Sequence, residues 1–422
     1  MEVLSLINKL IALLFVACYI HQAFFALAAL FSRPKALPAG RLNRYAVLIS
    51  ARNEEAVIGN LIQSIGRQDY PSEYIDIYVV ADNCTDATAQ VAREAGAIVW
   101  ERFDSVQVGK GYALQYLFER IWQNLPGRHY DGYLIFDADN LLDEHYITEM
   151  NKTFSAGYRV VTSYRAAKNY GENWLSAGYG LWFLREARYL NQARMTLGTS
   201  CAVSGCGFLV HHDIAERNHG WKHFLLTEDI EFTVDSVLHG ERIGYCDRAV
   251  FYDEQPTVFG QSWRQRLRWT KGGIQVFCRY GGDLLRGAMD SRRTASQRFA
   301  CFDMLMATSP AMILTLLGTL CNGLGLALSI LTCSQSLGLI CLTGLKSFLG
   351  GYILLLAVGG LTLLSEWRRI HCPSGKKLLY LLAFPLFMYT YLPISIVALF
   401  KKVEWKPIYH TCSKTLEQVR QE

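Results

Sequence analysis

Four long apolar stretches constrain this chain more than any other feature of its sequence. The first, residues 6–31, carries only Lys9 and His21 as basic residues. A helix of ~26 residues covers ~39 Å, which is enough to cross a bilayer. Three further apolar stretches follow, and the chain is 51% hydrophobic and only 19% charged. We therefore predict a multi-pass protein of the cell membrane, with one transmembrane helix at the start (1–32) and about three at the end (301–402).

Basic residues around these stretches bear on the topology. Four of them follow the first stretch directly: Arg33, Lys35, Arg41 and Arg44. Because Lys and Arg are retained on the cytoplasmic side, we expect the next region to be cytoplasmic, unless the first stretch is a cleaved signal peptide. Two basic clusters, 368–377 and 401–406, flank the last apolar stretch. One straight span would separate them, so either Pro385 and Pro393 break it into a re-entrant pair or one cluster departs from the rule, and the side of the C-terminus stays open.

Between the membrane regions, residues 44–256 alternate short apolar runs with amphipathic stretches. The runs RYAVLIS, IDIYVVAD and GYLIFDAD are typical of buried strands, and helical periodicity lies between them. This rhythm predicts an α/β fold with a doubly wound, mixed sheet and helices on both faces, which binds ligands at the carboxyl ends of its strands. Residues 257–300 are basic and amphipathic, which predicts helices in the membrane interface. Residues 403–422 form a C-terminal tail.

Charge and cysteine content exclude some classes of protein. The net charge is +5, from 42 Lys and Arg against 37 Asp and Glu, too small for the basic patch of a nucleic-acid-binding protein. We expect no nucleic-acid partner. The 12 cysteines show no CxxC or other metal-ligand spacing, so we expect free thiols in a reducing compartment. Sequons at Asn83 and Asn151 would matter only if this region were exported.

Acidic residues stand at the ends of predicted strands. Asp82 ends one apolar run, and Asp137 and Asp139 end another. Carboxylates that follow a buried strand are costly unless they are compensated. A divalent cation is the simplest compensation, because Mg²⁺ and Mn²⁺ prefer carboxylate and phosphate oxygens. An isolated DxD sequence more often marks a solvated turn, so other motifs must support a metal site.

Two later groups complete the set. Glu228 and Asp229 begin a predicted helix with Thr227 as its N-cap, although acidic residues there could simply favour the helix dipole. The sequence QRLRW, residues 265–269, lies in the basic amphipathic region. Its Trp269 could be an interfacial anchor or could stack on a bound ligand.

Taken in order, these groups resemble the motifs of the processive family-2 inverting glycosyltransferases, which include cellulose, chitin and hyaluronan synthases. The layout is closest to bacterial poly-N-acetylglucosamine synthases. DAD at 137–139 resembles the DxD of the family, TED at 227–229 its TED and QRLRW its QxxRW. Earlier segments, SARNE at 50–54 and ADNCTD at 81–86, resemble donor-site motifs, with Arg52 in place of the usual aromatic residue and Ala81 in place of the first Asp.

The resemblance covers about residues 45–275 and implies a GT-A nucleotide-sugar-binding domain inserted between transmembrane helices. It implies that Asp229 is the catalytic base, with Glu228 beside it, and that Asp139 and Asp137 hold Mg²⁺ or Mn²⁺. Lys110, in the segment GKG, would face the donor. The residues implied to bind substrates are Glu54, Asp82, Lys110, Asp137, Gln265, Arg268 and Trp269.

The implied activity is transfer of a sugar from a UDP-sugar, UDP-N-acetylglucosamine or UDP-glucose, to a growing β-linked polysaccharide that the membrane helices translocate. Accessory export proteins would be further partners. One alternative keeps the chemistry but adds a single sugar to a lipid acceptor, forming a glycolipid. Another is a non-catalytic membrane transport or assembly subunit. No gating-loop signature is recognisable after QRLRW, so processivity stays open, as do the sugar, the linkage and the oligomeric state.

Overall fold

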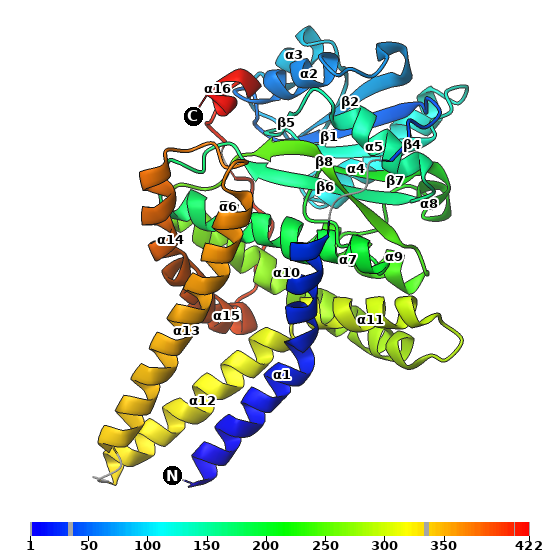
Figure 1. The fold of residues 1–422 in the computed structure, drawn as a ribbon. Helices are drawn as coiled ribbons and strands as arrows, with labels where there is room; N and C mark the ends of the chain where they lie inside the picture. Colours follow the sequence, from blue (N-terminus) through cyan, green and yellow to red (C-terminus); the bar gives the residue numbers. More distant parts are fainter. Residues whose placement is uncertain (1, 33–36, 333–336, 409, 422) are drawn as a thin grey trace.

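A computed structural model describes residues 2–32, 37–332, 337–408 and 410–421. An α/β domain lies at one end of the molecule, and long helices from both ends of the chain extend away from it (Figure 1). Of the residues considered above, Arg33, Lys35 and Cys333 lie outside the described residues. The cysteines within them are free thiols, as expected.

The domain is built on a mixed eight-stranded sheet with the strand order β3-β2-β1-β4-β7-β6-β8-β5. The first four strands in this order run parallel to one another, and β7 runs antiparallel to its neighbours β4 and β6. This confirms the predicted α/β fold class. The strands are β1 (Tyr45–Ala51), β2 (Ile75–Asp82), β3 (Ile98–Arg102), β4 (Gly132–Asp137), β5 (Leu141–Leu142), β6 (Val160–Ala167), β7 (Phe208–His211) and β8 (Ile243–Asp253).

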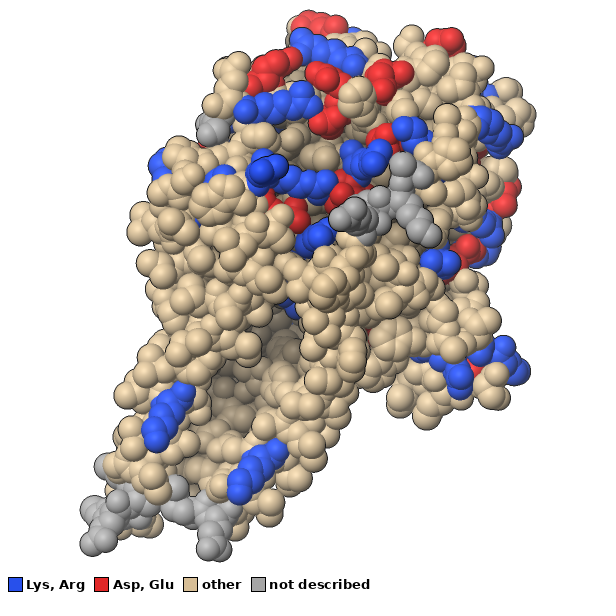
Figure 2. Space-filling view, in the orientation of Figure 1, with Lys and Arg blue, Asp and Glu red and all other residues tan. Residues whose placement is uncertain are grey.

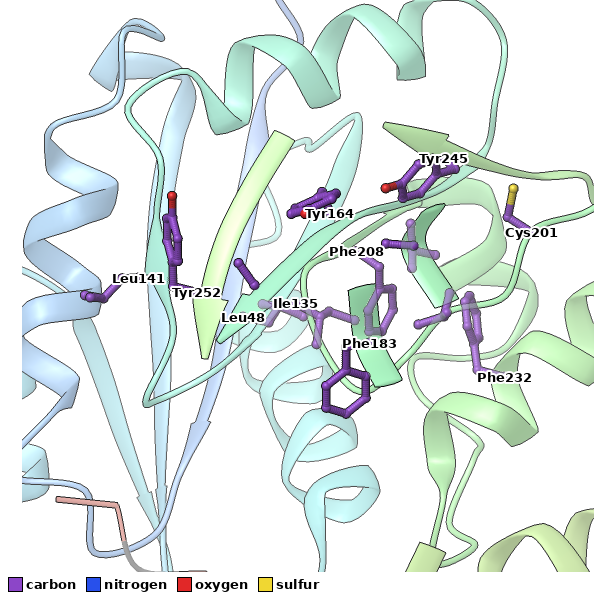
Figure 3. Close-up of a cluster of buried hydrophobic side chains, with 14 of the residues drawn as sticks. Leu48, Ile135, Leu141, Tyr164, Phe183, Cys201, Phe208, Phe232, Tyr245 and Tyr252 are labelled. Carbon is purple, nitrogen blue, oxygen red and sulfur yellow. The ribbon is translucent and has the colours of Figure 1, made fainter. Parts of the chain in front are cut away.

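Helices surround the sheet: α2 (Ile58–Gly66), η1 (Ser72–Tyr74), α3 (Thr88–Glu94), α4 (Lys110–Asn124), α5 (Tyr146–Ser155), α6 (Trp174–Arg185), η2 (Glu186–Asn191), α7 (Gln192–Leu197), α8 (His212–Arg217) and α9 (Glu228–Leu238). Because side chains alternate along a strand, Leu48 packs with α4 and α6, whereas Val47 packs with α2 and α5 on the other face. Figure 3 shows part of the first cluster, with Leu48 and Ile135 close to Phe208. A strand that is apolar throughout is therefore buried on both faces.

Two helices connect the domain to the membrane region. They are α10 (Phe259–Met289) and α11 (Ala295–Thr308), which pack on α9 through apolar side chains of all three helices. The region 301–402, predicted to hold the C-terminal transmembrane helices, is divided near its start, because α11 ends at Thr308 and α12 (Pro310–Leu331) starts at Pro310. Proline lacks a backbone N–H and fits the first turn of a helix, so a new helix begins there.

Four helices of the described residues are long and apolar enough to cross a membrane: Val3–Phe31, Pro310–Leu331, Gly338–Glu366 and Ser374–Phe400. The first lies in α1 (Glu2–Phe31) and the third in α13 (Leu337–Glu366). Their length and composition indicate membrane association.

The last apolar stretch is bent. It consists of α14 (Ser374–Tyr389) and α15 (Tyr391–Phe400), which meet at Thr390 and are followed by α16 (Leu416–Arg420). Both sides of the bent pair contact the α/β domain: Lys376 Nζ donates to the Gly171 carbonyl at 3.0 Å, and the Thr411 N–H donates to Glu254 at 3.0 Å. The two basic clusters therefore lie on the same side of the molecule, as the re-entrant alternative requires.

Candidate active site

A cavity of about 990 Å³ lies at the carboxyl ends of β1, β2 and β4, the edge where doubly wound sheets bind ligands. The strand register brings these ends together, with Ala51 opposite Ala81 and Ser50 opposite Asp137. Every site residue proposed from the sequence lines the cavity: Glu54, Asp82, Lys110, Asp137, Asp139, Glu228, Asp229, Gln265, Arg268 and Trp269. The fold thus gathers these residues, and the role of each remains a prediction.

Lys110, the first residue of α4, joins two of the acidic groups. Its Nζ lies 2.5 Å from Asp137 Oδ1 and 4.0 Å from Glu228 Oε1, and it donates to the Gly205 carbonyl at 2.9 Å. Burial favours a higher pKa for Asp137, but the Lys110 charge outweighs it and holds the pKa below its ordinary value. At Glu228 burial prevails and raises the pKa to about 7. The two carboxyl groups therefore differ in their proton affinity.

The turn that presents Lys110 needs glycine on both sides. Gly109 has a φ of 137°, which side chains with a Cβ rarely adopt. At Gly111 a Cβ would lie 2.1 Å from the His223 carbonyl oxygen. The segment GKG therefore allows the start of α4 to approach the neighbouring loop closely, and this approach sets the position of the Lys110 ammonium group.

Asp137 and Asp139 offer oxygen ligands for a metal ion. Asp139 is buried, and its Oδ2 accepts a hydrogen bond from the Glu254 N–H at 2.7 Å. Mg²⁺ is commonly held by one or two carboxylates together with phosphate oxygens of the substrate, and this pair of carboxylates fits that donor set. Among the described residues, three side chains that could hold a metal ion also lie together outside the cavity: His211, His212 and Asp213.

Asp229 is oriented by the loop between α7 and β7. Its Oδ2 accepts a hydrogen bond from the Gly205 N–H at 2.7 Å. Residues 202–205 of this glycine-rich loop line the cavity. Thr227 stands at the N-cap position of α9, but its side chain accepts no capping hydrogen bond. The side chain packs on α10, where a Cβ at Gly272 would lie 2.5 Å from its Oγ1 and Cγ2.

The QRLRW segment lies in α10, and its side chains lie on two sides of that helix. Gln265, Arg268 and Trp269 line the cavity, because residues three and four positions apart share one helix face. Arg266 is buried on another face, where its Nη1 donates to Thr390 Oγ1 at the bend between α14 and α15. The segment therefore links the cavity to the membrane helices.

Nothing in the sequence predicts the contribution of the C-terminal segment, which comprises residues 401–408 and 410–421. Residues 405–408 and His410 line the cavity. His410 Nδ1 lies 2.9 Å from Glu54 Oε1, and the Cys412 N–H donates to Glu254 at 2.9 Å. The Arg52 guanidinium lies 5.5 Å from the centre of the Trp405 ring. This segment covers one wall of the site.

Burial shapes the electrostatics of this wall. It raises the pKa of Glu54 to about 7. For His410, burial acts to lower the pKa, but attraction to Asp139 and Glu54 prevails and raises it to about 10. His410 is therefore protonated at neutral pH and adds a positive charge to a cavity rich in carboxylates.

Beyond Trp269 the cavity continues between the membrane helices. Figure 2 shows a hollow between helical arms whose surface is almost free of charge, below the charged α/β domain. The side chains that line this part of the cavity come from α1 and α11–α15 and are mainly apolar: Phe15, Tyr19, Met304, Met312, Leu316, Leu355 and Leu392. A polar and an apolar compartment are thus continuous.

A family model described as glycosyltransferase-like family 2 matches residues 43–272, more than half of the chain. The chain belongs to glycosyltransferase family 2. This match includes all the site residues proposed from the sequence and ends before the C-terminal segment.

Known proteins similar to this family-2 glycosyltransferase differ in their products. This chain is 27% identical over 240 residues to the beta-monoglucosyldiacylglycerol synthase of Synechocystis, and the alignment covers 56% of this chain and 48% of the relative. It is 22% identical over 234 residues to the poly-beta-1,6-N-acetyl-D-glucosamine synthase of Staphylococcus epidermidis, covering 55% of each. The chain therefore spans about half the length of these curated relatives.

A solved structure confirms the fold. The mannosyltransferase of Pyrobaculum calidifontis, in complex with GDP-Man and Mn²⁺, aligns with a TM-score of 0.61 over 93% of this chain and 99% of the other. The sequence identity is 14%, so this likeness supports the GT-A fold alone.

Proposed function

We propose that this family-2 glycosyltransferase transfers one sugar from a nucleotide sugar to a lipid acceptor at the membrane surface. The observation that carries the proposal is the continuity of the cavity, which runs from Asp137 and Asp139 to the apolar side chains of Met312 and Leu316 in α12. The polar end suits a nucleotide sugar. An acceptor with hydrocarbon chains would bury them at the other end, where apolar side chains line the cavity.

The donor diphosphate belongs at the polar end. When Mg²⁺ or Mn²⁺ is bound at Asp137 and Asp139, it supplies positive charge for the leaving diphosphate. Lys110, Arg268 and His410 also line the cavity and would stabilise the same developing charge. The UDP-sugar expected from the sequence, with N-acetylglucosamine or glucose, remains part of the proposal.

Asp229 is the proposed base. The Gly205 N–H donates to its Oδ2 and holds the carboxylate in place. The other carboxylate oxygen would accept a proton from the acceptor. The acceptor oxygen then attacks the anomeric carbon while the bond from that carbon to the diphosphate breaks. Because no enzyme nucleophile takes part, this single displacement inverts the anomeric centre.

The β-linked polysaccharide expected from the sequence is the second candidate product. Trp269 favours it, because the indole lines the cavity and is held edge-on by Tyr179, with ring centres 5.7 Å apart. Such a ring can stack on a sugar of a growing chain. Only this candidate involves translocation and accessory export proteins. The presence of all the carboxylates in one cavity disfavours a non-catalytic subunit.

Under either candidate, we propose that the protein spans the cell membrane several times and that its catalytic domain faces the cytoplasm. The helices that are long and apolar enough to span support this location. Arg44, which directly precedes β1, supports the cytoplasmic side, because basic residues near membrane helices are retained in the cytoplasm.

One experiment separates the candidates. Purified protein in lipid nanodiscs is incubated with labelled UDP-N-acetylglucosamine or UDP-glucose, and the products are partitioned into solvent and sized. We expect a single labelled glycolipid that Asp229→Asn does not form. A ladder of water-soluble products would replace the lipid candidate by the polymer. If no donor yields UDP with Mg²⁺ or Mn²⁺, both candidates fail.

A further inference from the structure

Arg185 occupies the boundary between the two compartments of the cavity. It is the last residue of α6 and lines the cavity together with Trp182 and with Gln22 of α1. Its Nη2 donates to Gln22 Oε1 at 2.7 Å, and its guanidinium carbon lies 5.1 Å from the centre of the Trp182 ring. The side chain is therefore held in place by neutral groups.

Two neighbouring arginines on the cavity wall have carboxylate partners. Arg165 pairs with Asp253, and Arg194 pairs with Asp303 at 2.7 Å. Among the described residues, no carboxylate oxygen lies within 4.0 Å of the Arg185 guanidinium nitrogens. Glu186, the next residue, accepts a hydrogen bond from Ser204 Oγ at 3.3 Å instead. Arg185 therefore lacks the ion pair that Arg165 and Arg194 have.

Burial lowers the pKa of Arg185, since Glu186 offsets it only in part and the Arg194 charge adds to it. A half-buried cation without an ion pair costs free energy, and an anion that enters the cavity would lower that cost. Guanidinium groups bind phosphate and carboxylate oxygens through two parallel hydrogen bonds. One Arg185 nitrogen already contacts Gln22, which leaves other N–H groups free to face the cavity.

The side chains around Arg185 change from polar to apolar along α1, as the surroundings of a lipid do between its headgroup and its chains. Gln22, Tyr19 and Phe15 lie on one face of α1 and all line the cavity, because residues three and four positions apart share a helix face. Along this face, amide gives way to phenol and then to an apolar ring. A lipid whose chains lie beside Phe15 would place its headgroup beside Gln22 and Arg185.

We infer that Arg185 binds an anionic headgroup of the lipid acceptor, a phosphate or a carboxylate. This inference rests on the proposed function, because it requires a lipid acceptor. It adds the charge class of that acceptor. Lys110 and His410 contact Asp137 and Glu54 at the proposed donor end of the cavity. Arg185 instead contacts Gln22 of α1. We therefore assign Arg185 to the acceptor and not to the donor diphosphate.

The test compares acceptors of matched chain length: phosphatidylglycerol, a hydroxy fatty acid and diacylglycerol, each in nanodiscs with labelled UDP-sugar. We expect kcat/KM to be at least ~10-fold higher for one or both anionic lipids than for diacylglycerol. The lipid that is used identifies the anion as phosphate or carboxylate. Arg185→Gln should raise KM for that lipid at least ~10-fold, and Arg185→Lys should restore part of the loss. Affinity for UDP should not change.

A control variant tests whether loss of any positive charge has the same effect. Arg93→Gln removes an exposed charge outside the cavity and should change nothing. Equal or better use of diacylglycerol would overturn the inference while leaving the lipid proposal intact, and so would an Arg93→Gln defect equal to that of Arg185→Gln. If no lipid of either charge is glycosylated, the proposed function itself fails.

Discussion

His410 Nδ1 lies 2.9 Å from Glu54 Oε1, although 356 positions separate the two residues in the sequence. This contact holds the C-terminal segment across the cavity. The far end of the segment is anchored separately, by Arg420 with Asp143 at 2.6 Å and by Asn60 with the Ser413 carbonyl at 2.9 Å. The segment is thus fixed at both ends over the proposed donor site.

The first prediction concerns the pH dependence of this docking. The pKa values of His410, about 10, and of Glu54, about 7, both lie above their ordinary values. The docked state therefore binds protons more tightly than the released state, so docking weakens as pH rises, first through about 7 and then through about 10. Trypsin cleavage after Lys414 should be slow at pH 7 and several-fold faster near pH 10, after correction for the activity of trypsin itself.

His410→Gln should be cleaved quickly at both pH values, because the charge that docks the segment is gone. His129→Gln, which alters an exposed histidine outside the cavity, is the matched control. Equal cleavage of wild type and His410→Gln at pH 7 would show that this ion pair does not hold the segment.

The second prediction concerns the metal. Asp139 is buried and contributes a carboxylate to the proposed site. Asp139→Asn keeps the shape of the side chain but removes its charge, so transfer should fall at least ~10²-fold. Titration with a chelator and then with Mn²⁺ should abolish and restore transfer in the wild type but not in Asp139→Asn. Asp290→Asn, at the half-buried C-cap of α10 and outside the cavity, should respond like wild type. Undiminished wild-type transfer in excess chelator would refute the metal role.

The parts of the site that could be predicted are those set by strand register. A parallel sheet with β1 between β2 and β4 brings the carboxyl ends of all three strands to one edge. Residues at the ends of these strands or just after them, such as Asp82 and Asp139, must then lie at that edge, whatever the loops between the strands look like. This rule needs only apolar runs and the acids that end them, both of which are visible in the sequence.

The contact between His410 and Glu54 could not be predicted in this way. It depends on the bend at Thr390, which returns the chain to the α/β domain. Pro385 and Pro393 made a break in this stretch one alternative, but they did not show which residues the returning chain would contact. Buried Arg266 stabilises the bend through its hydrogen bond to Thr390, a contact between segments that no local pattern reports. The absent side-chain cap at Thr227 has a similar origin, since packing on α10 overrides a local preference.

The third prediction tests the close approach at the start of α4. Gly111→Ala would place a Cβ 2.1 Å from the His223 carbonyl oxygen, so α4 or the loop must shift. We expect a loss of about 1–3 kcal/mol in the free energy of unfolding and reduced transfer, because Lys110 moves with the helix. Thermal unfolding in detergent measures the first effect. At Gly127 no atom lies within 4 Å of an added Cβ, so Gly127→Ala should leave both properties unchanged.

The last prediction separates the two carboxyl groups at the start of α9. Asp229 accepts a hydrogen bond from the Gly205 N–H at 2.7 Å, whereas Glu228 lies 4.0 Å from Lys110 and burial raises its pKa to about 7. A base must be ionised before it accepts a proton, and at neutral pH a substantial fraction of Glu228 is protonated.

Asp229→Asn should therefore lower turnover at least ~10²-fold while affinity for the UDP-sugar stays within a few fold. Glu228→Gln should mainly weaken donor binding, because it removes a partner of Lys110. Isothermal titration with UDP and single-turnover transfer measure the two effects. If Asp229→Asn retained near-normal transfer and Glu228→Gln did not, the base would be Glu228.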